Sequence, residues 1–483
     1  MSVLEAEKVL NRVLLITKSP ESSEATLRDV LGDLGRIIQS SLHVESLRRE
    51  LSQSELIWRL VRANLEQTLA EDELVSLRVR LLRGVVILGR NLLSMDREVA
   101  ERLEIRQVVF FFLDQLEGLK TLDADVFENS VVSAFQLLSN LTVNKKTHDR
   151  SLLYELVELF NRKAQWSENV TFTVLSYVNN VINDSDLLFE ALSKGKGYII
   201  MIDLLNQYEA LDTTRDLDRN GLLLVKIFSK LIVHESFFKF TMSYNKDEDS
   251  VRFLKVAEAL ITSKKSWEVF ELTVILSWLW ELYQKMLVKV QDFFNKAEGD
   301  AKIIYEELVM SLDCLSSLVH FEHTRKFLLS YQGVEMLISL LGILHKNIKP
   351  KKLKDSDRTK GADQTIEYSS FPHTKSMIIE TLSALTYQNF EVQEQMRELH
   401  GLELVLSNCI IDDNEPFIKE RSIVCLRFLL LNNDKNQEFV SKLEAQEAVP
   451  DETLDEAGFE VEIVDGKVRL KQKPKIEELH SES

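Results

Sequence analysis

The side chains that could do chemistry in this sequence are few and scattered. The three cysteines, Cys314, Cys409 and Cys425, include no Cys-x-x-Cys pair. Copper(I) and other soft metals need thiolate or thioether sulfurs brought close together, and no methionine-rich tract supplies them. His320 and His323 could share one helical face, but a lone pair of this kind is usually a surface feature. We therefore expect no bound metal and no cofactor.

The sequence also lacks the motifs that carry common catalytic mechanisms. It contains no G-x-S-x-G nucleophile turn, no phosphate-binding P-loop, no H-E-x-x-H zinc motif and no protein-kinase set. Acidic pairs such as Glu306-Glu307 and Asp412-Asp413 are expected at helix starts or on solvated faces. We therefore predict no catalytic residues and a non-enzymatic protein. A hidden enzyme would require a polar pocket with convergent ionisable groups.

The charge balance and composition exclude further classes of function. The 483 residues include 59 Lys and Arg against 77 Asp and Glu, which gives a formal net charge of −18. Such acidity argues against binding to nucleic-acid phosphates. The odd number of cysteines suits a reducing compartment. The longest apolar runs, Val108–Leu113 and Leu272–Trp280, are too short to span a membrane. We therefore expect a cytoplasmic protein without a membrane span.

The elements that must position any site are helices of a repeat. Eight segments share a marker Leu or Val, preceded by apolar residues, in a helix that ends at a polar turn. The markers are Leu92, Leu141, Val181, Leu231, Leu279, Leu318, Leu385 and Leu429. Their spacings run from 39 to 50 residues, apart from one of 67 that becomes 39 without the polar stretch His345–Pro372. This period predicts an all-α, armadillo/HEAT-like helical solenoid. Within it, Gly333 and Gly401 are expected at turns, as C′ residues.

Composition divides the chain into five parts. We predict an N-terminal helical cap over 1–75, armadillo-like repeats over 76–344, a basic flexible insertion over 345–372, a C-terminal homology domain over 373–445 and an acidic tail over 446–483. In the tail, alternating apolar residues flank Asp465-Gly466, which is typical of a short β-hairpin with a type I′ turn over 459–472. We expect the hairpin to pack on the last helices and cap the solenoid, or else to pair with a partner strand.

One group of candidate binding residues follows the repeat. In armadillo proteins that bind extended peptides, an Asn just before the marker Leu hydrogen-bonds the peptide backbone. Asn91, Asn140 and Asn180 hold this position here, and later units lose it. We predict a short peptide groove in the N-terminal half. The alternative is that these amides only satisfy neighbouring loops. In later units this position is held by apolar or aromatic residues such as Trp278, Ala384 and Phe428, which favours a packed interior or a groove for a partner helix.

A second group lies in the basic insertion. Its cationic residues are Lys346, Lys349, Lys351, Lys352, Lys354, Arg358 and Lys360. The segment lacks apolar periodicity and should form a mobile loop. It is either a tolerated solvated insertion or a docking or phosphorylation site for an acidic partner, with Lys351, Lys352 and Lys354 as binding candidates.

The most specific stretch of the sequence is 407–440. Asp412, Asp413 and Asn414 are good helix caps and Pro416 suits a first turn, so a helix is expected to start there. The predicted apolar face of this helix consists of Ile418, Ile423, Leu426, Leu429 and Leu430. Asn432-Asn433-Asp434 should end the helix, before another that opens at Gln437.

This stretch resembles the C-terminal homology domain of the ataxin-10 family. The family pattern Ile-Asp-Asp-Asn-x-Pro-Phe-Ile-(Lys/Arg)-Glu matches Ile411, Asp412, Asp413, Asn414, Pro416, Phe417, Ile418, Lys419 and Glu420. The pattern Arg-x-Leu-Leu-x-Asn-Asn-x-x-Asn-Gln matches Arg427, Leu429, Leu430, Asn432, Asn433, Asn436 and Gln437. Phe428 and Leu431 depart from it, because relatives often carry Asn and Glu there. The motif either binds a partner or is what this helix pair needs to pack.

The resemblance implies an armadillo-type, non-enzymatic cytoplasmic scaffold that regulates cytokinesis through protein contacts. The family has no catalytic residues to carry over. The divergent N-terminal two-thirds looks most like the fungal members, which are also named for copper transport. That name implies an alternative role in copper homeostasis, and the scattered cysteines would make that role indirect. The partners would be other proteins, bound as peptides or helices in a groove, and a homo-oligomer stays open.

Overall fold

The computed structural model describes most of the chain and divides it into two compact units. The described residues are 2–19, 21–142, 166–182, 197–212, 214–235, 237, 247–351, 367–443, 459–464 and 467–472. Unit 1 is Met1–Gln284 and unit 2 is Lys285–Ser483. The five-part division predicted from composition stays a prediction.

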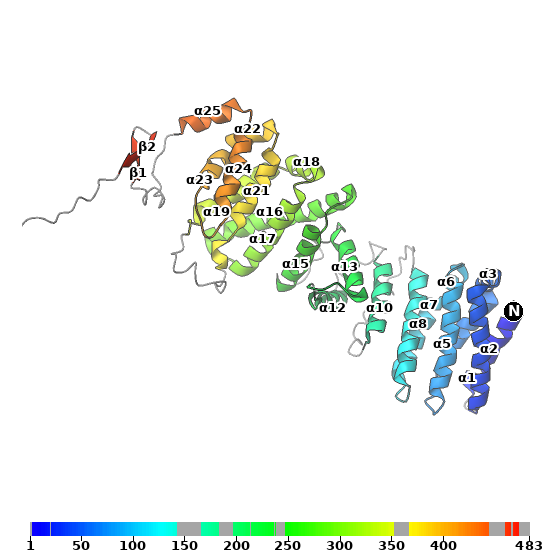
Figure 1. The fold of residues 1–483 in the computed structure, drawn as a ribbon. Helices are drawn as coiled ribbons and strands as arrows, with labels where there is room; N and C mark the ends of the chain where they lie inside the picture. Colours follow the sequence, from blue (N-terminus) through cyan, green and yellow to red (C-terminus); the bar gives the residue numbers. More distant parts are fainter. Residues whose placement is uncertain are drawn as a thin grey trace, which may run out of the picture. The chain divides into compact units, whose positions relative to one another are not determined.

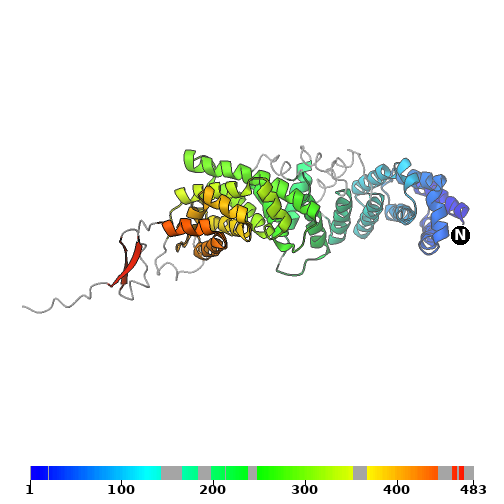
Figure 2. The ribbon, with the colours of Figure 1, turned by 90° about the horizontal axis from the view of Figure 1, so that it is seen from above.

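Unit 1 is a stack of helices in two layers. Its helices are α1 (Val3–Lys18), α2 (Glu24–His43), α3 (Glu45–Gln53), α4 (Glu55–Leu65), α5 (Val75–Leu92), α6 (Glu98–Arg102), α7 (Ile105–Gly118), α8 (Ala124–Thr142), α10 (Glu168–Val181), α12 (Gly197–Glu209), α13 (Arg219–Ile232), α15 (Asp247–Ser263) and most of α16 (Val269–Lys296). In one layer α2, α5, α8, α10 and α13 each contact the next (Figure 1 and Figure 2). In the other layer α1, α4 and α7 follow one another in the same way. The markers Leu92, Leu141, Val181 and Leu231 lie in the first of these layers.

Unit 2 repeats this arrangement with shorter helices. It contains the end of α16, then α17 (Ala301–Leu318), α18 (Glu322–Ser330), α19 (Gly333–Asn347), η1 (Tyr368–Ser370), α21 (Thr374–Thr386), α22 (Phe390–Glu398), α23 (Gly401–Ser407), α24 (Ile418–Leu430), α25 (Asp434–Lys442) and the strands β1 (Phe459–Val464) and β2 (Lys467–Gln472). The marker helices α17, α21 and α24 contact in order, and α19 packs against α21 and α23 (Figure 1).

A repeated three-helix unit is visible in the backbone itself. A short helix, a second helix and a marker helix follow one another as α6-α7-α8, α18-α19-α21 and α22-α23-α24. The residue between the first two helices has a left-handed conformation each time: Glu104 at φ 53°, Gln332 at φ 59° and His400 at φ 61°. The predicted all-helical, armadillo-like repeat is therefore confirmed. The sequence did not reveal this junction because none of the three residues is glycine.

The glycines at these junctions have a different role from the one predicted. Gly333 and Gly401 are the first residues of α19 and α23, not C′ residues in a left-handed turn. Close packing explains them, because a Cβ at position 333 would lie 2.7 Å from the carbonyl oxygen of Leu328 and one at position 401 would lie 2.8 Å from Cδ1 of Ile338. The left-handed residue is the one before each glycine.

The long apolar runs form core, as predicted. Val108–Leu113 lies in α7, where Val108, Val109, Phe112 and Leu113 are buried. Leu272–Trp280 lies in α16, where Trp278 is buried and its Nε1 donates to the carbonyl of Ile232 at 2.8 Å. Among the described helices no single one has the length and apolarity to cross a membrane, although α18 and α19, bent by 78° at their break, meet that criterion as a pair.

The two strands pair antiparallel near the C-terminus. Phe459 lies opposite Gln472 and Val464 opposite Lys467. The expected turn residues, Asp465-Gly466, lie outside the described residues. The turn type therefore stays a prediction.

Candidate protein-interaction surfaces

The three predicted marker asparagines lie in consecutive helices of one layer, and their amides bind the preceding helix. Nδ2 of Asn140 donates to the carbonyl of Arg90 at 3.3 Å, and Nδ2 of Asn180 donates to the carbonyl of Ser139 at 3.2 Å. In each case the acceptor is the residue just before the preceding marker asparagine. Nδ2 of Asn91, which is buried, donates to Oγ of Ser41 at 3.1 Å.

The same contact between neighbouring helices is also made in the next unit, where the residue before the marker is not asparagine. Lys230 replaces asparagine in the next unit, and its Nζ reaches the carbonyl of Asn179 at 3.0 Å and Oδ1 of the same residue at 2.7 Å. A donor at this position therefore satisfies a carbonyl near the end of the neighbouring helix, where intrahelical partners are missing. This packing role explains why asparagine recurs, whereas peptide binding by these amides stays a prediction.

The first half of the C-terminal motif does not start a helix, contrary to the prediction. The helix α24 begins at Ile418 after Phe417, and no side chain caps it. The Glu415 carboxylate instead accepts from the backbone N–H groups of Lys375 and Ser376, at 2.8 and 3.1 Å. These are free N–H groups in the first turn of α21, so the motif caps a helix about forty residues earlier in the chain.

The same segment holds the two ends of the insertion together. Oδ1 of Asp412 accepts from the backbone N–H of Lys351 at 2.9 Å, and Lys351 is the last described residue in the first part of the insertion. Oδ2 of Asp412 forms an ion pair with Nζ of Lys375 at 3.2 Å, and the side chains are 0% and 1% exposed. Where the described chain resumes, Oγ of Ser370 donates to Oδ1 of Asn414 at 2.8 Å and Nδ2 of Asn414 donates to the carbonyl of Ser370 at 2.8 Å. We call Asp412–Glu415 the insertion clamp.

The predicted lysine site can be placed only in part. Lys351 lies at the clamp, and its carbonyl accepts from the backbone N–H of Asp413 at 2.8 Å. Lys352 and Lys354 lie outside the described residues. Their role as a docking site for an acidic partner stays a prediction.

Burial changes the acidity of the clamp. It raises the pKa of Glu415 to about 7, against hydrogen bonds from Lys375 and Ser376 that lower it. The carboxyl of Glu415 is therefore close to half protonated at neutral pH, while it still accepts from the start of α21. The sequence offered no sign of this, because Glu415 is the variable position of the family pattern.

The second half of the motif joins α22, α24 and α25. Asn433 caps α25, and its Nδ2 donates to Oε1 of Gln393 at 3.2 Å. Nδ2 of Asn436 donates to the carbonyls of Leu429 and Gln393 at 2.9 and 3.2 Å, while its Oδ1 accepts from Arg397 at 2.8 Å. Gln437 donates to the carbonyl of Leu430 at 2.8 Å, which gives the end of α24 a partner.

Exposure separates the motif into buried and exposed halves. Asp412, Asn414, Ile418, Asn433 and Asn436 are buried, whereas the exposed members are Ile411, Pro416, Phe417, Lys419, Glu420, Asn432 and Gln437. The predicted apolar face of α24 is wrong at Ile423, which is 51% exposed, because Ser422 and Cys425 occupy the buried side. The buried half is explained by packing. In the exposed half, Gln437 donates to the end of α24, whereas no packing role is evident for Ile411 and Phe417 among the described residues.

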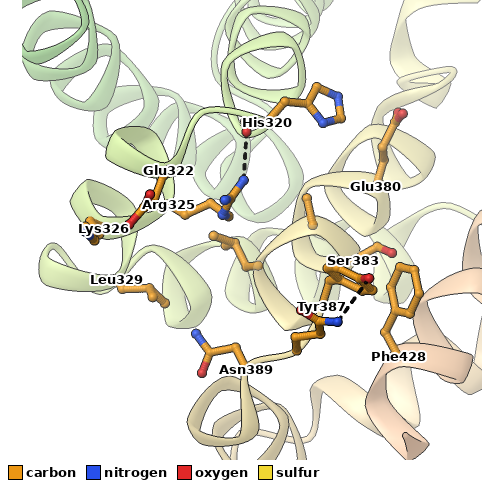
Figure 3. Close-up of a pocket in the computed structure, with 13 residues that line it drawn as sticks. His320, Glu322, Arg325, Lys326, Leu329, Glu380, Ser383, Tyr387, Asn389 and Phe428 are labelled. Atoms are coloured by element: carbon orange, nitrogen blue, oxygen red, sulfur yellow. Dashed lines mark hydrogen bonds and ion pairs between the residues drawn. The ribbon is translucent and has the colours of Figure 1, made fainter. Parts of the chain in front are cut away.

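An open groove in unit 2 was not foreseen from the sequence. It has a volume of about 770 Å³ and is lined by residues of α18, α21 and α24 and of the turns that follow α17 and α21 (Figure 3). Its lining residues are His320, Glu322, Arg325, Lys326, Leu329, Glu380, Ser383, Ala384, Leu385, Tyr387, Gln388, Asn389 and Phe428. Tyr387 is 51% exposed and meets Phe428 edge-on, with ring centroids 4.8 Å apart. The sequence did contain one indication of this groove, the aromatic residue Tyr387 two positions after the marker Leu385.

The charges in the groove are largely compensated. Lys326 pairs with Glu322 at 2.6 Å, and Arg421 pairs with Glu380 at 2.8 Å. Nη1 of Arg325 donates to the carbonyl of His320 at 2.8 Å (Figure 3). The remaining lining residues are apolar or uncharged polar side chains, among them Leu329 and the aromatic pair, so the groove suits binding of an apolar side chain more than acid–base chemistry.

The cysteines do not form a metal centre in the described part of the chain. Burial raises the pKa of Cys425 to about 12 and also raises the pKa of the half-buried Cys409. Both therefore favour the protonated thiol over the thiolate that binds metals. Within the residues that the structure describes, no group of three or more His, Cys, Asp or Glu side chains could hold a metal ion.

Comparison with known proteins identifies relatives across nearly the whole chain. The family described as "Spinocerebellar ataxia type 10 protein domain" matches residues 374–471. The ataxin-10 homolog of Debaryomyces hansenii is 31% identical, over 98% of this chain and 96% of its own length. That of Saccharomyces cerevisiae is 29% identical, over 97% of this chain and 96% of its own length. Ataxin-10 of Xenopus tropicalis is 41% identical over 20% of each chain.

Similarity to solved structures is weaker. A crystal structure of an engineered protein has a TM-score of 0.36 at 12% identity, over 90% of this chain and 91% of that one. The structure of SYS-1 has a TM-score of 0.35, over 90% of this chain and 77% of that one. The assignment therefore rests on the sequence relatives and on the motif whose geometry is described above. The chain belongs to the ataxin-10 family.

Proposed function

We propose that this protein is a non-enzymatic scaffold that binds a segment of a partner protein in the groove of unit 2. The observation that carries the proposal is an open groove lined by α18 and the marker helices α21 and α24, with Tyr387 and Leu329 exposed at 51% and 38%. An exposed aromatic residue in a concave site is a typical anchor for a partner side chain. The ion pairs at its edges would form the polar rim of such an interface.

Site-specific photo-cross-linking tests the proposal. A photoreactive phenylalanine analogue replaces Tyr387 in one variant and Phe270 in the control, since Phe270 is 73% exposed and lies in unit 1. We expect the variant at 387 to yield a discrete cross-linked protein in cells and the control to yield none. A cross-link to a second copy would show that the partner is a homo-oligomer. Equal products from both positions would contradict binding in the groove.

We further propose that the scaffold acts in the cytoplasm in the regulation of cytokinesis. Membership of the ataxin-10 family supports this role. Depletion should leave cells that divide their nuclei but do not separate, and a fluorescent fusion should be cytoplasmic. Normal division after complete depletion would contradict the proposal.

A role in copper homeostasis is the alternative, and it would be indirect. The raised pKa values of Cys409 and Cys425 support this view, because a protonated thiol is a poor ligand for copper(I). Metal analysis of the purified protein distinguishes the roles. Stoichiometric, tightly bound copper would favour direct copper handling over the scaffold.

We also propose that the C-terminal hairpin packs on the last helices and caps the exposed end of the solenoid. The exposed apolar residues Ile423 and Val424 on α24 support this position, as does the match of the family description through residue 471. Deletion of 459–472 should then increase hydrogen exchange in α24. Unchanged exchange would leave the hairpin available to pair with a partner strand.

A further inference from the structure

The groove of unit 2 contains a hydroxyl group without a partner in the described part of the chain. Ser383 of α21 is only 7% exposed and lines the groove (Figure 3). A helical serine often donates to the carbonyl four residues earlier, as Ser229 and Ser339 do here. Oγ of Ser383 makes no hydrogen bond to the described residues, and it is not enclosed by protein atoms. Because an unpaired polar group costs free energy, its partner must come from the groove.

Asn389 offers a second unused donor in the same groove. It lies in the turn between α21 and α22 and lines the groove (Figure 3). Its Oδ1 accepts from the backbone N–H of Val392 at 3.3 Å, which caps α22. This bond fixes the orientation of the amide, and Nδ2 makes no hydrogen bond to the described residues. The amide is therefore bound through its oxygen and presents two N–H groups to a ligand.

Arg325 of α18 adds donors from another wall of the groove. Its Nη1 donates to the carbonyls of Val319 and His320 at 3.1 and 2.8 Å, which fixes the guanidinium at the end of α17 (Figure 3). Nε and Nη2 make no hydrogen bond to the described residues. Glu322 pairs with Lys326 at 2.6 Å, and its pKa is lowered most by Lys326 and less by Arg325. Arg325 therefore keeps donors for a ligand, although Glu322 balances part of its charge.

The charge of the groove favours an anionic group. Its lining residues and their ion-pair partners include three Lys and Arg side chains, Arg325, Lys326 and Arg421, against the two carboxylates of Glu322 and Glu380. The excess is positive in a chain whose formal net charge is −18. A carboxylate accepts several hydrogen bonds at once, and such bonds are stronger than those between neutral groups. The unused donors and the charge therefore indicate the same ligand group.

The apolar part of the groove lies one helical turn from the unpaired hydroxyl. The backbone N–H of Tyr387 donates to the carbonyl of Ser383 at 3.1 Å, so the two side chains lie on the same side of the helix, about 5–6 Å apart at Cβ. The ring of Tyr387 meets Phe428 edge-on, and no cation lies over either ring in the described part of the chain. Alternate side chains of an extended peptide lie roughly 7 Å apart on one face. Two such side chains match this spacing.

We propose that the groove binds an extended segment of a partner protein in which an apolar residue and an acidic residue are two positions apart. The apolar side chain packs on Tyr387 and Phe428. The carboxylate accepts from the Ser383 hydroxyl and the Asn389 amide, and Arg325 supplies the opposite charge. This inference rests on the proposed binding in the groove and names the chemistry of the segment that binds there.

Fluorescence anisotropy with the full chain tests this inference. The probe is the labelled peptide Thr-Asp-Thr-Leu-Thr-Asp-Thr, which places an acid two positions from the leucine in either chain direction. A matched peptide carries Asn in place of both Asp residues. We expect the acidic peptide to bind at least about fivefold more tightly than the Asn peptide. Equal affinities, or no binding of the acidic peptide up to about 1 mM, would overturn the inference.

Asn389→Asp locates the carboxylate of the ligand. Asp caps a helix as well as Asn does, so α22 keeps its cap while the donor Nδ2 becomes an anionic oxygen. The variant should weaken the acidic peptide at least about tenfold and the Asn peptide less than about twofold. The control Asn11→Asp makes the same change on the exposed side of α1 and should change neither affinity by more than about twofold. Equal effects of the two variants would contradict the inference.

A second variant keeps the test independent of the cap. Ser383→Ala removes the unpaired hydroxyl and should weaken the acidic peptide about fivefold. It tests the same claim if Asn389→Asp does not fold. An unchanged preference for the acidic peptide in Ser383→Ala would show that this hydroxyl does not bind the carboxylate.

Cross-linking at position 387 separates this inference from the proposed function. A discrete cross-linked partner, together with equal affinity for the acidic and Asn peptides, would leave binding in the groove and refute the carboxylate. A preference for the acidic peptide without any cross-linked partner in cells would support the chemistry of the groove and contradict the proposed function. Failure of both measurements would refute both.

Discussion

The two units stabilise the same kind of helix stack by different means. In unit 1, one donor per repeat reaches a carbonyl of the preceding helix, and Asn140, Asn180 and Lys230 all do this within a few residues of the marker. In unit 2, buried residues of one short motif reach helices and loop ends that are distant in sequence. The first solution can be repeated in every unit, whereas the second is used once.

The difference shows why the two units look so unlike in sequence. A half-exposed amide can be replaced by lysine, as Lys230 shows, because only a donor of suitable reach is needed. A buried carboxylate that accepts from two backbone groups and a lysine cannot be replaced so easily. Packing thus gives the C-terminal motif its specificity, and binding is left to surfaces outside its buried half.

Removal of the clamp aspartate should have the largest effect. Asp412→Ala leaves Lys375 buried without its counter-charge, at 1% exposure, and also removes the acceptor for Lys351. Loss of one partner of a buried ion pair costs about 3–5 kcal/mol. Urea denaturation should therefore show a large fall in the free energy of unfolding.

A double variant separates charge from packing. Lys375→Met added to Asp412→Ala should recover much of the loss, because it removes the uncompensated charge. An equal loss in the single and double variants would contradict a buried ion pair as the cause.

The clamp should also make stability depend on pH. The pKa of Glu415 is raised from 4.5 to about 7 in the folded protein, so folding favours the protonated carboxyl. Its stabilising effect is complete below about pH 4.5 and is lost as the pH rises through 7, by about 3 kcal/mol. The difference in unfolding free energy between wild type and Glu415→Gln should fall over this range. If the unfolding free energies of wild type and Glu415→Gln changed equally with pH, Glu415 would not titrate in this way.

A matched pair of asparagines compares the two units directly. Asn436→Ala removes three buried hydrogen bonds, two to carbonyls and one from Arg397, which keeps its ion pair with Glu394, and this should cost about 2–3 kcal/mol. Asn140→Ala removes one half-exposed hydrogen bond and should cost about 0.5–1 kcal/mol. Thermal and urea denaturation of both variants would test the ranking, and a larger cost at position 140 would reverse the comparison.

The exposed half of the motif should matter least for stability. Phe417 is 61% exposed, so Phe417→Ser should change the free energy of unfolding by less than about 0.5 kcal/mol. A loss of several kcal/mol would mean that this side chain packs against a part of the chain that the described residues do not include.

The sequence predicted the repeat better than the details of its junctions. The marker spacing correctly indicated stacked helix units, because burial of a marker residue leaves a periodic apolar pattern. Cap chemistry near Asp412 was assigned to the wrong helix, because a carboxylate can cap any helix that folds against it. The left-handed residues Glu104 and Gln332 could not be foreseen, since neither residue type indicates that conformation.

The candidate sites were harder to predict than the fold. The role of the marker asparagines was left open between peptide binding and packing, and their observed contacts explain their packing role. The groove around Tyr387 depends on exposure after folding, which no local pattern records.

Quantitative affinity capture with three matched single variants tests the central claim, that the motif packs while the groove binds. Tyr387→Asp changes the groove, Phe417→Asp changes the exposed motif and Phe270→Asp controls for an exposed aromatic residue in unit 1. We predict that only Tyr387→Asp loses the partner found by cross-linking at position 387. Retention of that partner by Tyr387→Asp, with loss in Phe417→Asp, would contradict the account.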